Sequence, residues 1–263
     1  MISKKKLIEY AKKKNYNLGQ AEIDYYQEII LFILYQEFGK EVVFKGGTAL
    51  TKCYGFDRFS EDLDFTTTKG DFEKIISVGL KKYYIEFTVE KKEMNDSINI
   101  TYKIKGPLYS GQPNTTCKID LDFSTREEVL IETNTKRIGI YVDDIPSFDV
   151  VVMSEEEIFS EKIRAIITRN KARDLYDIYY LIKRNTPINI ALINKKLSIY
   201  NLAYTYNLLK EAVESKKGIW EKELRHLVKR FPEYSEVKKT LLDSMRLHIS
   251  SSTKQSRQKP TRT

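Results

Sequence analysis

The chain has 263 residues, of which 31% are charged and 41% hydrophobic, with 45 Lys and Arg against 37 Asp and Glu. This apolar fraction is ordinary for a folded protein and argues against wholesale disorder. The net charge of +8 is uneven: the first 14 residues hold six lysines and one glutamate, and the segment from Arg246 onward holds five basic residues and no acid. The remainder is near neutral, with 34 basic and 36 acidic residues. A uniformly basic nucleic-acid coat is therefore excluded, although a local basic patch is not.

Cysteine usage and hydropathy indicate the compartment. Cys53 and Cys117 are too sparse for a secreted disulfide scaffold, which favours a reducing cytoplasm. The most apolar stretch, residues 29–35, is far shorter than the roughly 20 residues that a membrane helix needs. The N-terminus has lysines but no apolar run of the kind found in signal peptides. We expect a cytoplasmic protein with no membrane partner.

The first half of the chain mixes helical and strand patterns. Apolar residues at helical spacing predict a helix over 20–38, and an acidic first turn predicts another over 71–82. Thr48 follows two glycines and begins a further helix. Short apolar or alternating runs predict strands at 42–44, 63–66, 85–89, 98–104 and 117–123. Residues 105–114 are rich in Gly and Pro and predict a loop.

The second half is helical in pattern. Ser154 and Glu157 form a capping-box sequence that opens a helix reaching about Arg169. Helical spacing then continues to about residue 249 and is broken at Pro187, Gly218 and Pro232. The last residues are rich in Ser, Thr, Lys, Arg and Gln, which is typical of a disordered segment. We therefore predict an α+β domain, a helical domain and a disordered basic tail, over residues 1–152, 153–249 and 250–263.

A glycine-rich turn is the first candidate site. Lys45-Gly46-Gly47-Thr48 stands between a predicted strand and a predicted helix. Two glycines let backbone N–H groups approach an anion, the helix N-terminus favours phosphate, and the Thr48 hydroxyl can donate one more hydrogen bond. The same triplet also makes ordinary turns, so alone it is a weak signal. The Walker pattern is absent, which would make this a different kind of phosphate loop.

Two acids on one strand strengthen the case. Asp62 and Asp64 alternate with apolar residues, so both carboxylates point to one face of a strand. Carboxylate oxygens are the ligands that Mg²⁺ prefers, and two of them can converge on one or two cations. The strand over 117–123 offers a third acid if it pairs beside the first. We prefer Asp120, with Asp122 as the alternative; either is also explicable as a surface acid of an edge strand.

Charged residues of the second half offer a further candidate. Lys162 lies on a largely apolar helical stripe, where a lysine either meets an anion or pairs with a carboxylate such as Glu161 or Asp174. Arg173, Asp174 and Asp177 lie within one helical turn. Such a cluster is equally typical of an ordinary salt-bridged helix start.

These segments together resemble a known family. Gly-Gly-Thr followed by Asp-Leu-Asp is similar to the signature of the polymerase-beta-like nucleotidyltransferase superfamily. Longer blocks resemble the AbiEii/AbiGii-type toxins, namely residues 44–50, 58–65, 156–165 and 173–177. The blocks run from about residue 42 to 182 in the order of the family. The resemblance implies a mixed sheet with flanking helices, followed by a helical C-terminal domain.

The resemblance also implies roles for matching residues. Asp62 and Asp64 correspond to the metal-binding pair. Gly46, Gly47 and Thr48 correspond to the nucleotide-phosphate loop. Lys162 corresponds to a lysine that holds the triphosphate. Asp174 corresponds to an acid proposed to take part in catalysis, within a nucleotide-binding block that includes Arg173 and Asp177.

The expected activity is that of a Mg²⁺-dependent nucleotidyltransferase with two metal ions and an NTP substrate. Asp120 would ligate the second cation and help to deprotonate the attacking hydroxyl. The resemblance implies a toxin of a phage-defence toxin–antitoxin pair with a dedicated antitoxin, and an RNA acceptor, with the tRNA 3′ end as the leading candidate. The alternatives are a transferase that places AMP or phosphate on a protein, and a catalytically silent nucleotide- or RNA-binding module. Retention of Asp62 and Asp64 argues against the silent module.

Overall fold

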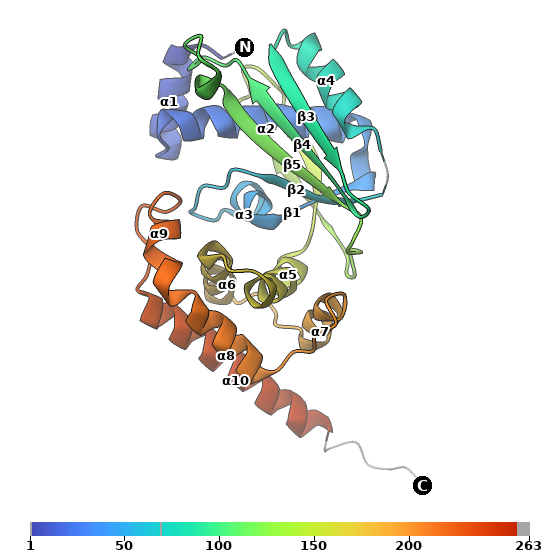
Figure 1. Cartoon of the computed structure of the whole chain (residues 1–263), viewed down its shortest axis with the longest axis vertical. Coiled ribbons are helices and arrows are strands. Elements are labelled where there is room, and N and C mark those ends of the chain that lie inside the picture. Colours follow the sequence, from blue (N-terminus) through green and yellow to red (C-terminus); the bar gives the residue numbers. More distant parts are fainter. Residues whose placement is uncertain (1, 69, 257–263) are drawn as a thin grey trace. The chain divides into compact units, whose positions relative to one another are not determined.

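The computed structural model describes residues 2–68 and 70–256, with side chains described up to residue 248 (Figure 1). The chain divides into two compact units, and the division falls between Met153 and Ser154. The boundary predicted from the sequence, after residue 152, is one residue earlier. Each unit is described by itself.

The first unit is built on a seven-stranded mixed sheet with the order β3-β4-β5-β2-β1-β7-β6. β2 pairs with β5, and β1 with β7, in parallel, whereas the other neighbours are antiparallel. The strands are β1 (Val42–Lys45), β2 (Leu63–Thr67), β3 (Phe87–Glu93), β4 (Ser97–Ile104), β5 (Cys117–Ser124), β6 (Asn134–Ile138) and β7 (Phe148–Val152). This sheet confirms the predicted α+β fold class. Strands β6 and β7 were not predicted. In β6, Ile138 is the one buried residue and no apolar alternation marks the strand.

The described part of this unit contains the helices α1 (Lys4–Lys14), α2 (Leu18–Glu37), α3 (Gly46–Tyr54) and α4 (Phe72–Lys82). Two short 3-10 turns, η1 (Gly39–Glu41) and η2 (Pro113–Thr115), lie in the connections. Helix α2 begins with a capping box in which Asn17 and Gln20 exchange hydrogen bonds. It runs along one face of the sheet and packs against α1 and α4 (Figure 1). Helix α1 was not predicted, because it is rich in lysine and its buried face consists only of Leu7 and Ala11, which is too short to give a clear apolar pattern.

A row of aromatic rings fills the core beneath the central strands. Ring centroids of Phe44 and Phe65 lie 5.5 Å apart, those of Phe65 and Phe123 4.9 Å apart, and those of Phe123 and Phe72 4.1 Å apart. Such rings bury large apolar areas and dominate core energetics. Because side chains alternate along a strand, the residues between these phenylalanines point to the opposite face. That face carries the acidic residues of β2 and β5.

The second unit is helical: α5 (Glu155–Thr168), α6 (Ala172–Lys183), α7 (Ile190–Ser198), α8 (Tyr206–Ser215), η3 (Lys217–Ile219), α9 (Trp220–Leu224) and α10 (Tyr234–Ser256). The Ser154 hydroxyl caps α5 by accepting the N–H of Glu157 at 3.2 Å. The predicted breaks at Pro187, Gly218 and Pro232 all fall between α-helices.

Helix α10 is longer than the sequence predicted. Helix α10 continues to Ser256, past residue 250, where the disordered tail was predicted to begin. The rest of the predicted tail, residues 257–263, lies outside the described residues. In the described part of the chain, no helix combines the length and apolar character needed to cross a membrane.

Candidate functional site

The glycine-rich turn packs directly against the acidic strand β2. Helix α3 begins at Gly46, whose φ of +74° lies in the left-handed region that favours glycine. A methyl group on Gly46 would overlap the Oδ2 atom of Asp64 and lie 3.0 Å from its carboxyl carbon. A methyl group on Gly47 would likewise overlap the guanidinium of Arg58. A side chain on either glycine would therefore have to displace a neighbouring side chain, and at Gly46 the backbone conformation also favours glycine.

The third residue of the turn, Thr48, has a structural partner. Its buried hydroxyl donates a hydrogen bond to the backbone carbonyl of Asp62. The hydroxyl expected to face a phosphate thus ties α3 to the residue that enters β2. Its assignment to the phosphate loop stays a prediction, and its observed contact is a positioning one.

The parallel pairing of β2 and β5 brings two carboxylates side by side. Asp64 is the register partner of Asp122, and Lys45 of β1 is the register partner of Asp64 on its other side. Burial raises the pKa of Asp122, the negative charge of Asp64 raises it further, and Lys45 and Arg126 partly lower it. Two neighbouring carboxylates that repel each other favour a bound cation. This pair is the part of the predicted metal site that the structure brings together.

Asp120, the acid preferred from the sequence, is engaged elsewhere. One of its oxygens accepts a hydrogen bond from the Thr101 hydroxyl at 2.6 Å, and the other lies 2.6 Å from the ammonium of Lys118. The hydrogen bond to Asp120 raises the pKa of Lys118, against a lowering by burial, and the charges of Asp120 and Asp62 raise it further. Because both oxygens of Asp120 have partners, the geometry favours the alternative, Asp122, as the third carboxylate.

The carboxylates do not form a complete metal-coordination site. Among the side chains that the structure describes, residues 2–68 and 70–248, no three His, Cys, Asp or Glu residues already converge as a metal site. The donor set nevertheless fits a hard cation, because it consists of carboxylate oxygens and because Asp64 and Asp122 already repel each other. Asp62 and Asp64 are both half-buried, so their carboxylates remain reachable from solvent.

The predicted site residues of the second unit form a buried ion-pair cluster. The Lys162 ammonium lies 2.8 Å from Asp174 and 2.7 Å from Asp177, and Arg169 lies 2.8 Å from Asp174. Burial alone would raise the pKa of Asp174, but Lys162 and Arg169 outweigh it and hold this pKa well below the usual range. The ion pairs predicted as the alternative for Lys162 are therefore present in the structure. Arg173 precedes Asp174 in α6 and is half-buried.

A second buried ion-pair cluster joins α7 to α5. Lys196 of α7 is fully buried and lies 2.7 Å from Glu157 and 3.2 Å from Glu161. Glu161, named from the sequence as one partner for Lys162, therefore pairs with Lys196. No sequence signal pointed to Lys196, because its partners lie more than 30 residues away along the chain.

Three further polar residues near Asp62 and Asp64 were given no role in the site predicted from the sequence. Lys45 ends β1 and Arg58 precedes β2; both are buried. Gln27 of α2 is also buried and donates to the carbonyls of Ser60 and Glu61. The sequence signal that could have found Gln27 is a polar side chain on the apolar stripe of a predicted helix.

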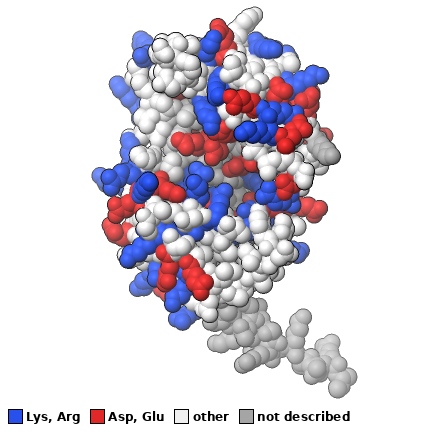
Figure 2. All heavy atoms as spheres, in the orientation of Figure 1, with Lys and Arg blue, Asp and Glu red and all other residues white. Residues whose placement is uncertain are grey.

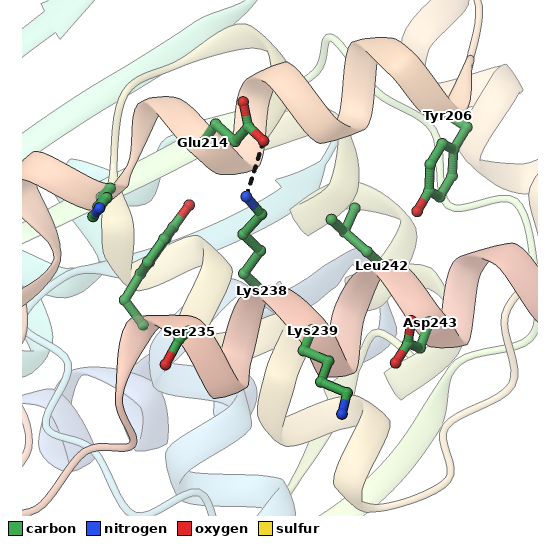
Figure 3. Close-up of a pocket in the computed structure, with 9 residues that line it drawn as sticks. Tyr206, Glu214, Ser235, Lys238, Lys239, Leu242 and Asp243 are labelled. Atoms are coloured by element: carbon green, nitrogen blue, oxygen red, sulfur yellow. Dashed lines mark hydrogen bonds and ion pairs between the residues drawn. The ribbon is translucent and has the colours of Figure 1, made fainter.

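The second unit also carries two hollows that sequence reasoning did not anticipate. A groove of about 640 Å³ lies between α8 and α10, and there the Lys238 ammonium lies 2.9 Å from Glu214 (Figure 3). Tyr206, Lys239 and Asp243 also line it. A hollow of about 630 Å³ shares Lys217 with this groove and is lined by Lys217, Gly218, Glu221, Lys222, Arg225 and His226. None of the predicted site residues lines either hollow.

Comparison with known families decides what the chain is. The family model described as nucleotidyl transferase AbiEii toxin, type IV toxin–antitoxin system, matches residues 30–242. The chain belongs to the AbiEii family. It is therefore a nucleotidyltransferase, as the resemblance predicted, and the AbiEii context implies a nucleotide substrate and an antitoxin partner.

Solved structures share the AbiEii chain's fold. MenT4, the nucleotidyltransferase toxin Rv2826c of Mycobacterium tuberculosis H37Rv, is 19% identical with a TM-score of 0.65, and the match covers 91% of this chain and 88% of that one. JHP933 of Helicobacter pylori is 20% identical with a TM-score of 0.61, and the match covers 90% of this chain and 95% of that one. Comparison with curated proteins gave no match. At these identities the likeness establishes the common fold.

Proposed function

We propose that this AbiEii nucleotidyltransferase transfers a nucleotide from an NTP to an RNA acceptor with the help of Mg²⁺. The observation that carries the proposal is the pair Asp64 and Asp122, which strand register sets side by side and of which Asp64 packs against Gly46 at the start of α3. A carboxylate pair beside a helix N-terminus places cation ligands next to backbone donors for phosphate.

Asp62, Asp64 and Asp122 would hold the metal, which we propose to be two Mg²⁺ ions. When bound, such ions supply charge neutralisation on the phosphates of the NTP. As the third carboxylate, Asp122 would take the role first assigned to Asp120 and help to accept the proton of the attacking hydroxyl. Asp120 instead keeps Lys118 in place.

Phosphate binding would fall to the glycine turn and the cations around it. The backbone N–H groups of Gly46 and Gly47 begin α3, where the helix dipole favours an anion. The Arg58 guanidinium lies against Gly47 and is buried, so it supplies positive charge where water screens it little.

We propose that Lys162, which belongs to the second unit, contacts the triphosphate. Its ammonium has three donors, of which two face Asp174 and Asp177, and one is left for a phosphate oxygen. The two acids would then hold the ammonium in place, and Arg169 balances Asp174. In this arrangement Asp174, Asp177 and Arg173 support nucleotide binding through Lys162.

The charge distribution favours RNA as the acceptor. Residues 15–153 hold 16 basic and 23 acidic residues, whereas residues 154–245 hold 18 basic and 13 acidic ones. The near-neutral body thus averages an acidic segment, residues 15–153, and a basic segment, residues 154–245. The face drawn in Figure 2 intersperses both signs and is not a uniformly basic coat. Lys217, Lys222 and Arg225 line one hollow against a single acid, which suits a phosphate backbone.

The biological setting follows from the family. We propose that the tRNA 3′ end is the acceptor, that the reaction takes place in the cytoplasm, where NTPs and RNA are present, and that the toxin serves phage defence. Its antitoxin would relieve the resulting growth inhibition.

One labelling experiment tests the proposed reaction. Purified protein is incubated with Mg²⁺ and each labelled NTP in turn, together with total RNA and cell lysate, and the Asp64→Asn variant is the control. We expect Mg²⁺-dependent label in RNA from the wild type only. Label in protein would identify a protein-modifying transferase, and label in neither would identify a silent binding module; either result overturns the proposal.

A further inference from the structure

Three consecutive backbone carbonyls at the entry to β2 are each held by a side chain from a helix. The Nε2 atom of Gln27 donates to the carbonyls of Ser60 and Glu61 at 3.0 and 2.9 Å. The Thr48 hydroxyl donates to the carbonyl of Asp62, the next residue. The backbone that carries the first proposed metal ligand is therefore fixed by α2 on one side and α3 on the other.

The amide of Gln27 is chemically specific for this task. A primary amide nitrogen has two hydrogens, and here both go to neighbouring carbonyls. A glutamate at this position has no hydrogen to donate when ionised and would repel both oxygens. A methionine of similar length would fill the space and leave both carbonyls without this donor.

The two helices that supply these donors are themselves joined by a buried ion pair. Lys52 of α3 lies 2.6 Å from Asp24 of α2, with their side chains 2% and 3% exposed. The Tyr141 hydroxyl donates to the second oxygen of Asp24 at 2.7 Å. Burial would raise the pKa of Asp24, but Lys52, Lys14 and the Tyr141 hydroxyl together outweigh it and lower this pKa. Gln27 lies less than one turn beyond Asp24 and thus acts from an anchored part of α2.

We infer that Gln27 is a positioning residue for the Asp62 carboxylate. By fixing the carbonyls of Ser60 and Glu61, it sets the direction in which the chain enters β2. That direction decides whether the Asp62 carboxylate lies on the face shared by Asp64 and Asp122. The inference rests on the proposed function, because it assigns Gln27 to the same metal site. Residues that orient metal ligands in this way typically change metal affinity about 10–100-fold when they are replaced.

The test measures metal binding apart from activity. Mn²⁺ binding to the full-length chain is followed by electron paramagnetic resonance, and thermal melting is recorded without metal. Gln27→Met and Gln27→Glu should each weaken Mn²⁺ binding about 10-fold. Both variants should also need more Mg²⁺ for half-maximal transfer, with partial recovery of the rate at saturating Mg²⁺. Glu22→Met is the matched control, because Glu22 is a buried acid of the same helix that holds Leu108 in a different loop.

The control and a ligand variant separate the possible failures. Unchanged Mn²⁺ affinity in both Gln27 variants would overturn the inference. So would an equal loss of affinity in Glu22→Met at a matched drop in melting temperature, since the effect would then be a general loss of stability. Asp62→Asn tests the proposed function itself: if it binds Mn²⁺ and transfers nucleotide as the wild type does, the proposed site fails. If Asp62→Asn weakens binding and the Gln27 variants do not, the inference about Gln27 fails alone.

Discussion

The Oδ2 atom of Asp64 occupies the space that a side chain on Gly46 would need. The turn proposed to bind phosphate is therefore in close contact with a carboxylate proposed to bind metal. Gly46 tolerates this contact because it has no Cβ and because its φ of +74° is accessible to glycine. The closeness of Asp64 to the start of α3 would place a metal ion next to the phosphates that the helix attracts.

Replacement of Gly46 should separate activity from stability. Gly46→Ala puts a methyl group into the Asp64 carboxylate, whereas Gly55→Ala, at the other end of α3, has a similar φ of +72° and meets nothing within 4 Å. Both changes should cost about 1–2 kcal/mol for the left-handed backbone. Only Gly46→Ala should also lower transfer, by about 100-fold, because a displacement of about 1 Å is enough for that loss. Melting curves and labelled-NTP transfer check this, and equal activity in the two variants would refute the proposed contact.

The two acids of β5 should differ in importance. Asp122→Asn should abolish transfer without loss of stability, since it removes a charge that repels Asp64. Asp120→Asn should retain most of the transfer activity, since Asp120 is occupied by Lys118 and Thr101. Transfer rates and melting temperatures of the two variants decide between the acids. The reverse order of activities would return Asp120 to the metal site.

The buried cluster of the second unit should show a characteristic pH dependence. The depressed pKa of Asp174 means that its stabilising contribution is present above the usual carboxyl pKa of about 3.9 and is lost as the pH falls toward its folded value. Lys162→Met leaves Asp174 and Asp177 with one cation fewer, which should cost about 3–5 kcal/mol near neutral pH. The pKa values of the acids then rise, so their protonation at low pH should relieve the loss. Urea melts at pH 5 and pH 8 should show the smaller deficit at pH 5.

A surface lysine of the same unit is the control for this measurement. Lys183 is half-exposed and lies 3.9 Å from Glu236, and such exposed pairs contribute little. Lys183→Met should therefore melt like the wild type at both pH values. If Lys162→Met did so as well, the lysine would have no structural role and would act on the nucleotide alone.

The basic hollow of the second unit should contribute to RNA affinity. Lys222→Ala with Arg225→Ala removes two lining charges, and Arg225 has an exposed pairing with Glu221 at 3.4 Å, so little stability should be lost. If both contact phosphates, RNA binding should weaken and the slope of log K against log salt should flatten by up to about 0.9 per contact. Lys81→Ala with Lys82→Ala removes the same charge from α4 of the first unit and should leave the slope unchanged. Equal slopes in the two double variants would exclude the hollow as an RNA contact.

Local features of the sequence determined most of the helices and strands. They also marked the glycine turn, Asp62 and Asp64 as candidate site residues. Period-2 alternation identified β2, β4 and β5, because one face of each strand meets the core. The glycine turn, the acids of β2 and the cap at Ser154 were all recognisable, because each depends on neighbours within a few residues. The patterns failed where an element has almost no apolar face, as in α1 and β6.

The remaining choices depended on contacts between residues far apart in the chain. The register of β2 against β5 set Asp122, and not Asp120, beside Asp64. The alternation of side chains along β5 cannot distinguish Asp120 from Asp122, because both lie on the same face of the strand. The partners of Lys162 and Lys196 were decided by the packing of α5 against α6 and α7. A sequence shows which side chains carry charge or hydrogen-bonding groups, whereas burial and the position of the nearest partner set their pKa and their role. For this AbiEii chain, the sequence indicated the kind of chemistry, and only the tertiary structure decided which carboxylates and amides stand together in the candidate site.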